Sequence, residues 1–205
     1  MNIVKYILAL FVSCLFAGNV RAQDFTEEQK IIFERNVEEA VADFLTYLSE
    51  ISDEQHSIQL KNKYVEKALS LFVANGEAYS YYDVEAESHN ILNTGAKLYI
   101  SSTSSGITKA QTVKNYLKKI LHLRNIKIYI ESADVVRIDN MLEVGDHYEC
   151  IAYVYVKCYN FVENRSVCSY GSILKIRCFI NQEDKSTYKV KLGDIFAAQT
   201  RNNFK

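Results

Sequence analysis

From His147 to Phe196, apolar and polar residues alternate with a period of two. Successive side chains of a β-strand point to opposite faces, so this alternation predicts three consecutive antiparallel strands, separated by short polar turns, with one buried face. The apolar face consists of the even positions Cys150, Ala152, Val154, Val156, Cys158, Tyr170, Leu174, Ile176, Cys178, Ile180, Tyr188, Val190 and Leu192. The odd positions are rich in tyrosine, lysine and arginine, which predicts a face turned away from the core.

Amphipathic helices are predicted upstream of this sheet. Apolar residues recur every three or four positions from Phe25 to Ile51, and Thr26 and Gln29 have the spacing of a capping box at the start of that helix. A second helix follows the polar gap Ser52–Ser57, and Gly76 is a suitable stop after it. These two helices supply apolar faces that can cover the sheet.

The middle of the chain predicts a third helix and shorter strands. The helix is expected at Thr108–Leu123, again from a capping-box spacing, and short strands at Tyr79–Val84 and Lys97–Ser101. A further strand is expected at Ile126–Asp139. The fold class is therefore α+β, with about four long antiparallel strands and a short strand pair packed on three helices.

Three tyrosines lie close together in the first short strand, at Tyr79, Tyr81 and Tyr82. Tyrosine combines an apolar ring with a polar tip, so these side chains suit the mouth of a ligand site. The alternative is that they pack as ordinary strand-forming residues.

The first 22 residues have the pattern of an export signal. Lys5 precedes an apolar core at Ile7–Phe16, and Val20-Arg21-Ala22 is a small-x-small cleavage site. The apolar run is shorter than the roughly 20 residues that span a bilayer, although an uncleaved membrane anchor is the alternative. We therefore expect a signal peptide at 1–22, one domain at 23–205, no stable membrane span after cleavage, and a periplasmic or extracellular location.

Composition and motifs exclude several function classes. The net charge is −1, without the clustered basic excess of a nucleic-acid-binding protein, so no nucleic-acid partner is expected. The chain contains no GxSxG, HExxH, GxGxxG or P-loop motif, and no CxxC or Cys/His ligand spacing. We expect no metal and no cofactor. His147, next to Asp146, could form an acid–base pair or be structural.

Four cysteines follow the signal region, all at even positions: Cys150, Cys158, Cys168 and Cys178. A three-residue turn at Val162-Glu163-Asn164 would place Cys158 opposite Cys168. Cys150 would then lie one two-residue step from Cys178, a difference that a single bulge can absorb. The alternatives are disulfides, which an exported chain permits, and free cysteines in the core.

Asp134 is the candidate catalytic or ligand-binding carboxylate. On the even register of its strand it points inward among apolar residues, where its pKa would be raised as in a general base. Tyr170 and Ser172 point to the same side from another strand and could bind a polar group of a ligand. The alternative is a bulge near Ala133 that turns Asp134 outward.

The odd face is the candidate interface. Tyr153, Tyr155 and Ile173 lie among lysine and arginine residues, a composition that suits an apolar interface core with a polar rim. The alternative is a solvated sheet surface.

The order of helix, helix, short strand pair, helix and four long strands resembles the nuclear transport factor 2-like superfamily over nearly the whole mature chain. The segment Thr112–Ile130, with Val113, Tyr116-Leu117 and Leu121 before the strand, is also similar to exported members from gut-type Bacteroidetes. The resemblance implies a curved sheet wrapped around the helices, a cone-shaped pocket for a small hydrophobic ligand, and dimers.

Enzymes of that superfamily use an inward aspartate, or a histidine–aspartate pair, with tyrosine donors. Only Asp134 and Tyr170 could take those parts here. Because no catalytic motif is matched, the expected function is a non-enzymatic binding or interaction protein, with a homodimer through the outer sheet face as one partner. The alternative is a cofactor-free isomerase or dehydratase-like enzyme that uses an inward Asp134.

Overall fold

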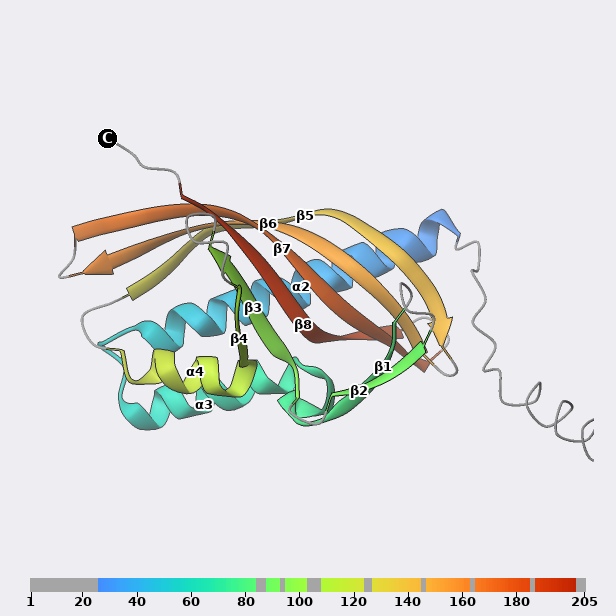
Figure 1. Cartoon of the computed structure of the whole chain (residues 1–205), viewed down its shortest axis with the longest axis horizontal. Coiled ribbons are helices and arrows are strands. Elements are labelled where there is room, and N and C mark those ends of the chain that lie inside the picture. Colours follow the sequence, from blue (N-terminus) through green and yellow to red (C-terminus); the bar gives the residue numbers. More distant parts are fainter. Residues whose placement is uncertain are drawn as a thin grey trace, which may run out of the picture.

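The computed structural model describes residues 26–83, 88–92, 95–102, 108–123, 127–144, 147–162, 165–184 and 187–201. The predicted export signal lies outside these residues. Three helices form one layer: α2 (Glu27–Ser52), α3 (Ile58–Ser70) and α4 (Val113–Leu121). A curved sheet arches over α2 and forms the second layer (Figure 1). The predicted α+β class is confirmed.

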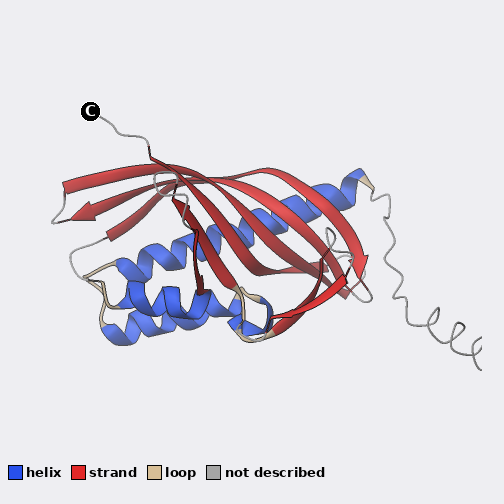
Figure 2. Cartoon of the chain, viewed as in Figure 1, coloured by secondary structure: helices blue, strands red, loops and turns tan. Residues whose placement is uncertain are grey.

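The large sheet has six strands in the order β4-β3-β8-β7-β6-β5. Their bounds are β3 (Lys97–Ser102), β4 (Thr108–Thr112), β5 (Lys127–Val144), β6 (His147–Val162), β7 (Arg165–Asp184) and β8 (Thr187–Arg201). All neighbours are antiparallel except β3 and β8, which are parallel. A separate hairpin of β1 (Tyr79–Asp83) and β2 (Ser88–Leu92) lies near one end of the sheet (Figure 2).

Helix α2 forms where its sequence pattern places it. The side chain of Thr26 accepts a hydrogen bond from the Gln29 amide, and the Gln29 side chain accepts one from the Thr26 amide, so the predicted capping box is present. The apolar stripe of α2 is buried, with Phe33, Val37 and Ile51 fully inaccessible. This stripe contacts β5 and β8, while α3 and α4 also pack on α2.

The third predicted helix begins later than its sequence indicates. Residues Thr108–Thr112 form β4, which pairs with β3, and α4 starts only at Val113. The side chain of Thr112 caps α4 by accepting from the Asn115 amide. The Thr108 capping-box prediction was wrong, because pairing with β3 satisfies the backbone of this segment instead.

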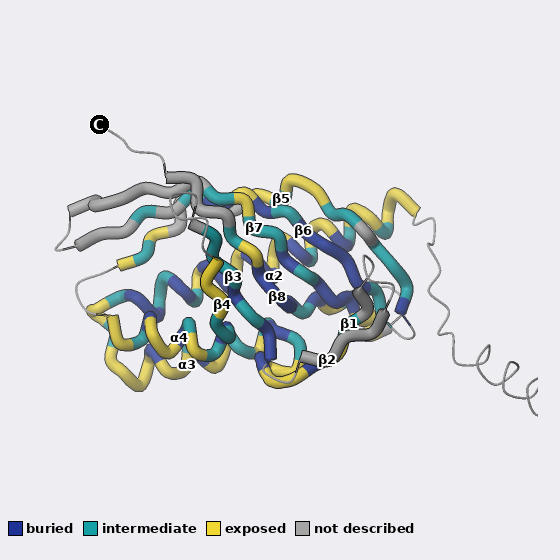
Figure 3. Tube along the Cα trace, in the orientation of Figure 1, coloured by how far each residue is buried: buried dark blue, intermediate teal, exposed yellow. Residues whose placement is uncertain are grey.

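The alternation of the long strands is confirmed at their centres. Cys150, Ala152, Val154 and Val156 of β6 are all buried on the face toward α2, while Tyr155 is exposed. Buried residues are concentrated between this face and the helices (Figure 3). Among the described residues, no helix is both long enough and apolar enough to cross a membrane.

Strand β8 changes register at a bulge. Leu192 pairs with Cys178 and Ile195 pairs with Ile176, so Gly193 and Asp194 together oppose one residue of β7, Arg177. Because one extra residue exchanges the two faces, Ile195 points into the core although it is an odd position. The strict even register predicted for this strand ends at Leu192.

Candidate functional site

Asp134 points away from the core. It is exposed and pairs with Tyr155, which is also exposed, on the face opposite α2. The register shifts between Ile130 and Ser132, so Glu131 is an inserted bulge residue that turns Asp134 outward. Of the two alternatives that the sequence left open, the bulge that turns Asp134 outward is the one observed, and the enzyme hypothesis loses its general base.

The other predicted ligand-binding residues do not form a site with Asp134. Ser172 pairs with Val156, which is buried on the inner face, and is itself half-buried. The side chain of Tyr170 lies outside the described residues; its backbone pairs with Cys158. Asp134 and Ser172 therefore belong to opposite faces of the sheet.

The outer face, defined as the sheet surface away from α2, carries the predicted interface residues. Tyr155 pairs directly with Ile173, so their side chains lie next to each other on this face. Ile173 is 52% exposed and Tyr155 is 37% exposed. Tyr153 lies one step along β6 on the same face and pairs with Lys175. The structure therefore places these three residues together on one face of the sheet.

Cations and aromatic rings alternate along the next row of the outer face. The Arg137 guanidinium lies 4.3 Å from the centre of the Tyr153 ring, and Lys175 Nζ lies 5.9 Å from the centre of the Phe196 ring. Phe196 in turn stacks on Tyr99 of β3, with ring centres 4.5 Å apart. Such contacts hold the aromatic side chains in defined positions, which lowers the entropy cost of binding a partner.

The β1–β2 hairpin covers one end of the outer face. Tyr79 packs edge-on against Phe179 of β7, and the Arg177 guanidinium lies 3.9 Å from the centre of the Tyr81 ring. The tyrosines of β1 thus pack against the sheet, which is the second of the two alternatives that their sequence left open. The side chain of Tyr82 lies outside the described residues.

A buried carboxylate, Glu149, joins the charged groups beneath the hairpin. Its oxygens lie 3.2 Å from His147 Nε2 and 3.7 Å from Arg177 Nη1. Burial of a carboxylate is costly unless opposite charges and hydrogen bonds compensate it, which these neighbours do. Among the described contacts His147 pairs with Glu149, two residues along the same strand, whereas the sequence had indicated Asp146, which lies outside the described residues.

Asp194, at the β8 bulge, links the hairpin to the large sheet. Its Oδ1 accepts a hydrogen bond of 3.0 Å from the Tyr79 hydroxyl and one of 2.8 Å from the Lys97 amide. Burial raises the pKa of Asp194 above that of an ordinary aspartate, and burial raises the pKa of Tyr79 as well. The carboxylate is only 4% exposed and both donors come from the protein, so we interpret it as a structural anchor.

Asp194 was not among the candidate residues that the sequence pattern indicated. The available signal was the break in alternation at Gly193-Asp194, where the apolar positions switch from Val190 and Leu192 to Ile195. A glycine inside a strand often marks a bulge or a close backbone approach. Both apply here, because a Cβ at Gly193 would lie 2.7 Å from the Phe179 ring.

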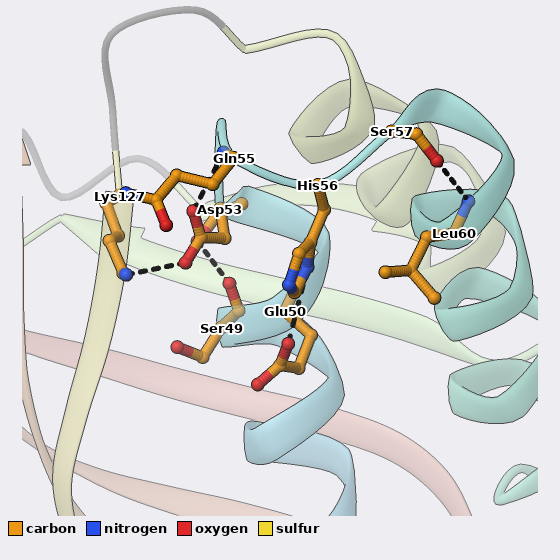
Figure 4. Close-up of polar contacts among 9 residues, drawn as sticks. Ser49, Glu50, Asp53, Gln55, His56, Ser57, Leu60 and Lys127 are labelled. Carbon is orange, nitrogen blue, oxygen red and sulfur yellow. Dashed lines mark hydrogen bonds and ion pairs between the residues drawn. The ribbon is translucent and has the colours of Figure 1, made fainter.

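A second polar cluster joins α2 to α3 and β5 (Figure 4). Asp53 accepts hydrogen bonds from the Gln55 amide at 3.0 Å and from Lys127 Nζ at 2.6 Å. His56 lies against Glu50, with Nδ1 3.1 Å from the Glu50 carbonyl oxygen. The hydrogen bond from Lys127 is the main reason that the pKa of Asp53 is lowered. These contacts hold the helix turn against the start of β5.

Replacing Asp53 by asparagine is expected to lower the free energy of unfolding at neutral pH by about 0.5–1 kcal/mol. Because the folded-state pKa of Asp53 is lowered, its contribution is present above the unfolded pKa and is lost as the pH falls through the folded one. The difference between wild type and D53N should therefore begin to shrink as the pH falls below about 4, and should vanish only below the folded-state pKa, in urea unfolding curves. The control is E183Q in the exposed Glu183–Lys189 pair, where a smaller effect is expected. An equal effect of the two substitutions at pH 7 would contradict the prediction.

Within the described residues, no group of three or more histidine, cysteine, aspartate or glutamate side chains is arranged to hold a metal ion.

The predicted cysteine register was partly wrong. In the backbone pairing, Cys158 is opposite Tyr170 and Cys168 is opposite Asn160, because Val162 pairs with Arg165 and the register shifts between Asn160 and Phe161. The same shift places Cys150 directly opposite Cys178.

Comparisons with known proteins give a distant likeness of fold. No protein-family model and no curated protein matches the sequence. A solved structure described as an NTF2-like protein with a cystatin-like fold, from Novosphingobium aromaticivorans, is similar with a TM-score of 0.39 and 9% sequence identity. The match covers 89% of this chain and 94% of that one. At this TM-score and identity the likeness carries no argument about family or function.

Proposed function

We propose that this chain is an exported, non-enzymatic binding or interaction protein of the nuclear transport factor 2-like type, with the outer face as its protein interface. The fold assignment is supported by the curved sheet that arches over α2, and export by the signal pattern of residues 1–22. The partner that we propose for the outer face is a second copy of the same chain. The binding of a small hydrophobic ligand on the inner side of the sheet is still a prediction.

The observation that carries the proposal is the apolar centre of the outer face. Ile173 and Tyr155 form an exposed cross-strand pair in the middle of the sheet, and Phe196 is 39% exposed one row away. Val136 of β5, 60% exposed, extends this surface. Apolar and aromatic side chains grouped in this way, with charges around them, are typical of protein interfaces.

The charge pattern favours a second copy as the partner. Asp134 pairs with Tyr155, and Arg137 pairs with Tyr153, so the two charges lie in adjacent rows on the same strand. Consider a two-fold axis that lies in the interface and crosses the strands between these rows. It places Asp134 of each copy opposite Arg137 of the other, and Tyr155 opposite Tyr153. Self-complementarity of this kind is what a two-fold dimer requires.

The test is a charge exchange in the dimer, measured by sedimentation equilibrium. Wild type is expected to be dimeric. D134R alone, or R137D alone, places like charges opposite each other and should raise the dimer dissociation constant about 10–100-fold. The double variant D134R/R137D restores opposite charges and should recover most of the lost affinity.

Matched controls are E38R and R35D on the exposed side of α2, which should leave the dissociation constant unchanged. Circular dichroism melts establish that each variant is folded, which matters because R137D also removes the 2.9 Å ion pair with Asp139. A wild-type monomer at the highest soluble concentration would overturn the proposed dimer. So would single variants that dimerise as wild type does.

A further inference from the structure

Two cysteines lie face to face in the core of the protein. Cys150 of β6 and Cys178 of β7 are Cα partners in the antiparallel register, so their side chains project to the same side. Both are free thiols in the structure, and interaction with the Cys178 side chain is the main reason that the pKa of Cys150 is raised. Both residues are buried, with 2% and 0% exposure.

We propose that Cys150 and Cys178 form a cross-strand disulfide, made by thiol–disulfide exchange while β6 and β7 pair during folding of the exported chain. The bond would be a covalent modification at the centre of the sheet. It rests on the proposed export, because disulfides form and persist in the oxidising compartments that exported proteins enter.

The backbone spacing suits such a bond. Residues directly opposite in an antiparallel pair have Cα atoms about 4.5–5.5 Å apart, within the range of about 4.4–6.8 Å found across disulfides. Their Cβ atoms are about 4.5–5.5 Å apart, and disulfides need about 3.5–4.5 Å. Bond formation therefore draws β6 and β7 slightly together at this one pair and requires no change of register.

The exchange balances with a low-molecular-weight disulfide as the oxidant. The Cys150 thiolate attacks one sulfur of the small disulfide, which forms a mixed disulfide and releases one small thiolate. The Cys178 thiolate then attacks the Cys150 sulfur, forms the cross-strand bond and releases the second thiolate. The protein loses two protons and two electrons, and the oxidant becomes two thiols.

Burial determines when the bond can form. Hydrogen bonding to Cys178 and burial raise the pKa of Cys150 in the folded protein, which disfavours the reactive thiolate. Exchange must therefore take place before α2 covers the inner face. Once formed, the disulfide is shielded from reductants by the same burial.

The other two cysteines are not Cα partners of this pair or of each other. The backbone of Cys158 faces Tyr170, and that of Cys168 faces Asn160. Of the possible pairs among these four cysteines, the register therefore brings together only Cys150 and Cys178 as Cα partners.

The experiment uses the full chain, reduced and denatured, then refolded in a glutathione buffer that contains glutathione disulfide. Remaining thiols are alkylated in denaturant, and the digest is analysed by mass spectrometry without reduction. The expected product is a linked peptide pair that contains Cys150 and Cys178, lighter by two hydrogen atoms than the two free peptides. Reduction before heating should lower the unfolding midpoint by about 5–10 °C.

Control variants separate this pair from the others. C158A/C168A should keep the linked peptides and the shift, whereas C150A and C178A should each lose both. Alkylation of both Cys150 and Cys178 after refolding, or a link from either to Cys158 or Cys168, would overturn the proposal. Refolding does not depend on export. Suppose that the bond forms on refolding but that cells retain the protein with residues 1–22 attached. This result would support the cysteine pairing and refute export.

Discussion

Replacing Asp194 by alanine is expected to lower the free energy of unfolding by about 2–4 kcal/mol. The substitution removes the acceptor of the Tyr79 hydroxyl and of the Lys97 amide. A buried donor without an acceptor costs about 1–3 kcal/mol, and Tyr79 is only 7% exposed. The measurement is urea unfolding of wild type and D194A. A loss under about 1 kcal/mol would show that water replaces the carboxylate.

The matched variant D194N separates the hydrogen bonds from the charge. The asparagine carbonyl can still accept from both donors, so D194N should be much more stable than D194A. The folded-state pKa of Asp194 is raised, so folding favours the protonated form, and wild-type stability from this group falls as the pH rises through that pKa. D194N lacks this loss, so its stability relative to wild type should increase from pH 4 towards neutrality. A constant difference across this range would contradict the burial argument.

Replacing Gly95 by alanine is expected to destabilise the protein by about 2–3 kcal/mol. Gly95 has a φ of +76°, in the left-handed region, and a Cβ there would lie 2.0 Å from the carbonyl oxygen of Gly76. Because the clash is with backbone, no side-chain rotation can relieve it. The measurement is the change in unfolding free energy from denaturant titration.

The control for Gly95 is the reverse substitution nearby. Ala74 is exposed and has a φ of 48°, a conformation that disfavours a residue with a Cβ by about 1–2 kcal/mol. A74G should therefore be neutral or stabilising, in contrast to G95A. If G95A also proved neutral, the chain would be able to move Gly76 and Gly95 apart without cost.

The sequence predicted those parts of the fold that local interactions determine. Thr26 and Gln29 indicated where α2 begins, and its bonds lie within three residues. The alternation around Val154 and Tyr155 indicated which side of β6 is buried, because the side-chain period of a strand is local geometry. The grouping of Tyr153, Tyr155 and Ile173 followed from the same period.

The candidate site was less predictable because it depends on pairing between distant residues. The period of the strand left Asp134 either inside or turned outward by a bulge, and an insertion at Glu131 relative to β6 turns it outward. Asp194 was missed because its partners, Tyr79 and Lys97, are 115 and 97 residues away along the chain. Neither the insertion nor these contacts leave a periodic signal in one strand.

Local patterns in the chain were sufficient to predict the α+β class, the position of α2 and the buried face of β6 and β7, since each follows from hydrogen bonds and side-chain periods over a few residues. The three-dimensional structure was needed to find the bulges in β5 and β8, the pairing of Cys150 with Cys178, and the position of the β1–β2 hairpin on the outer face. These features depend on how strands far apart in sequence align, and a shift of one residue in that alignment exchanges the faces of a strand.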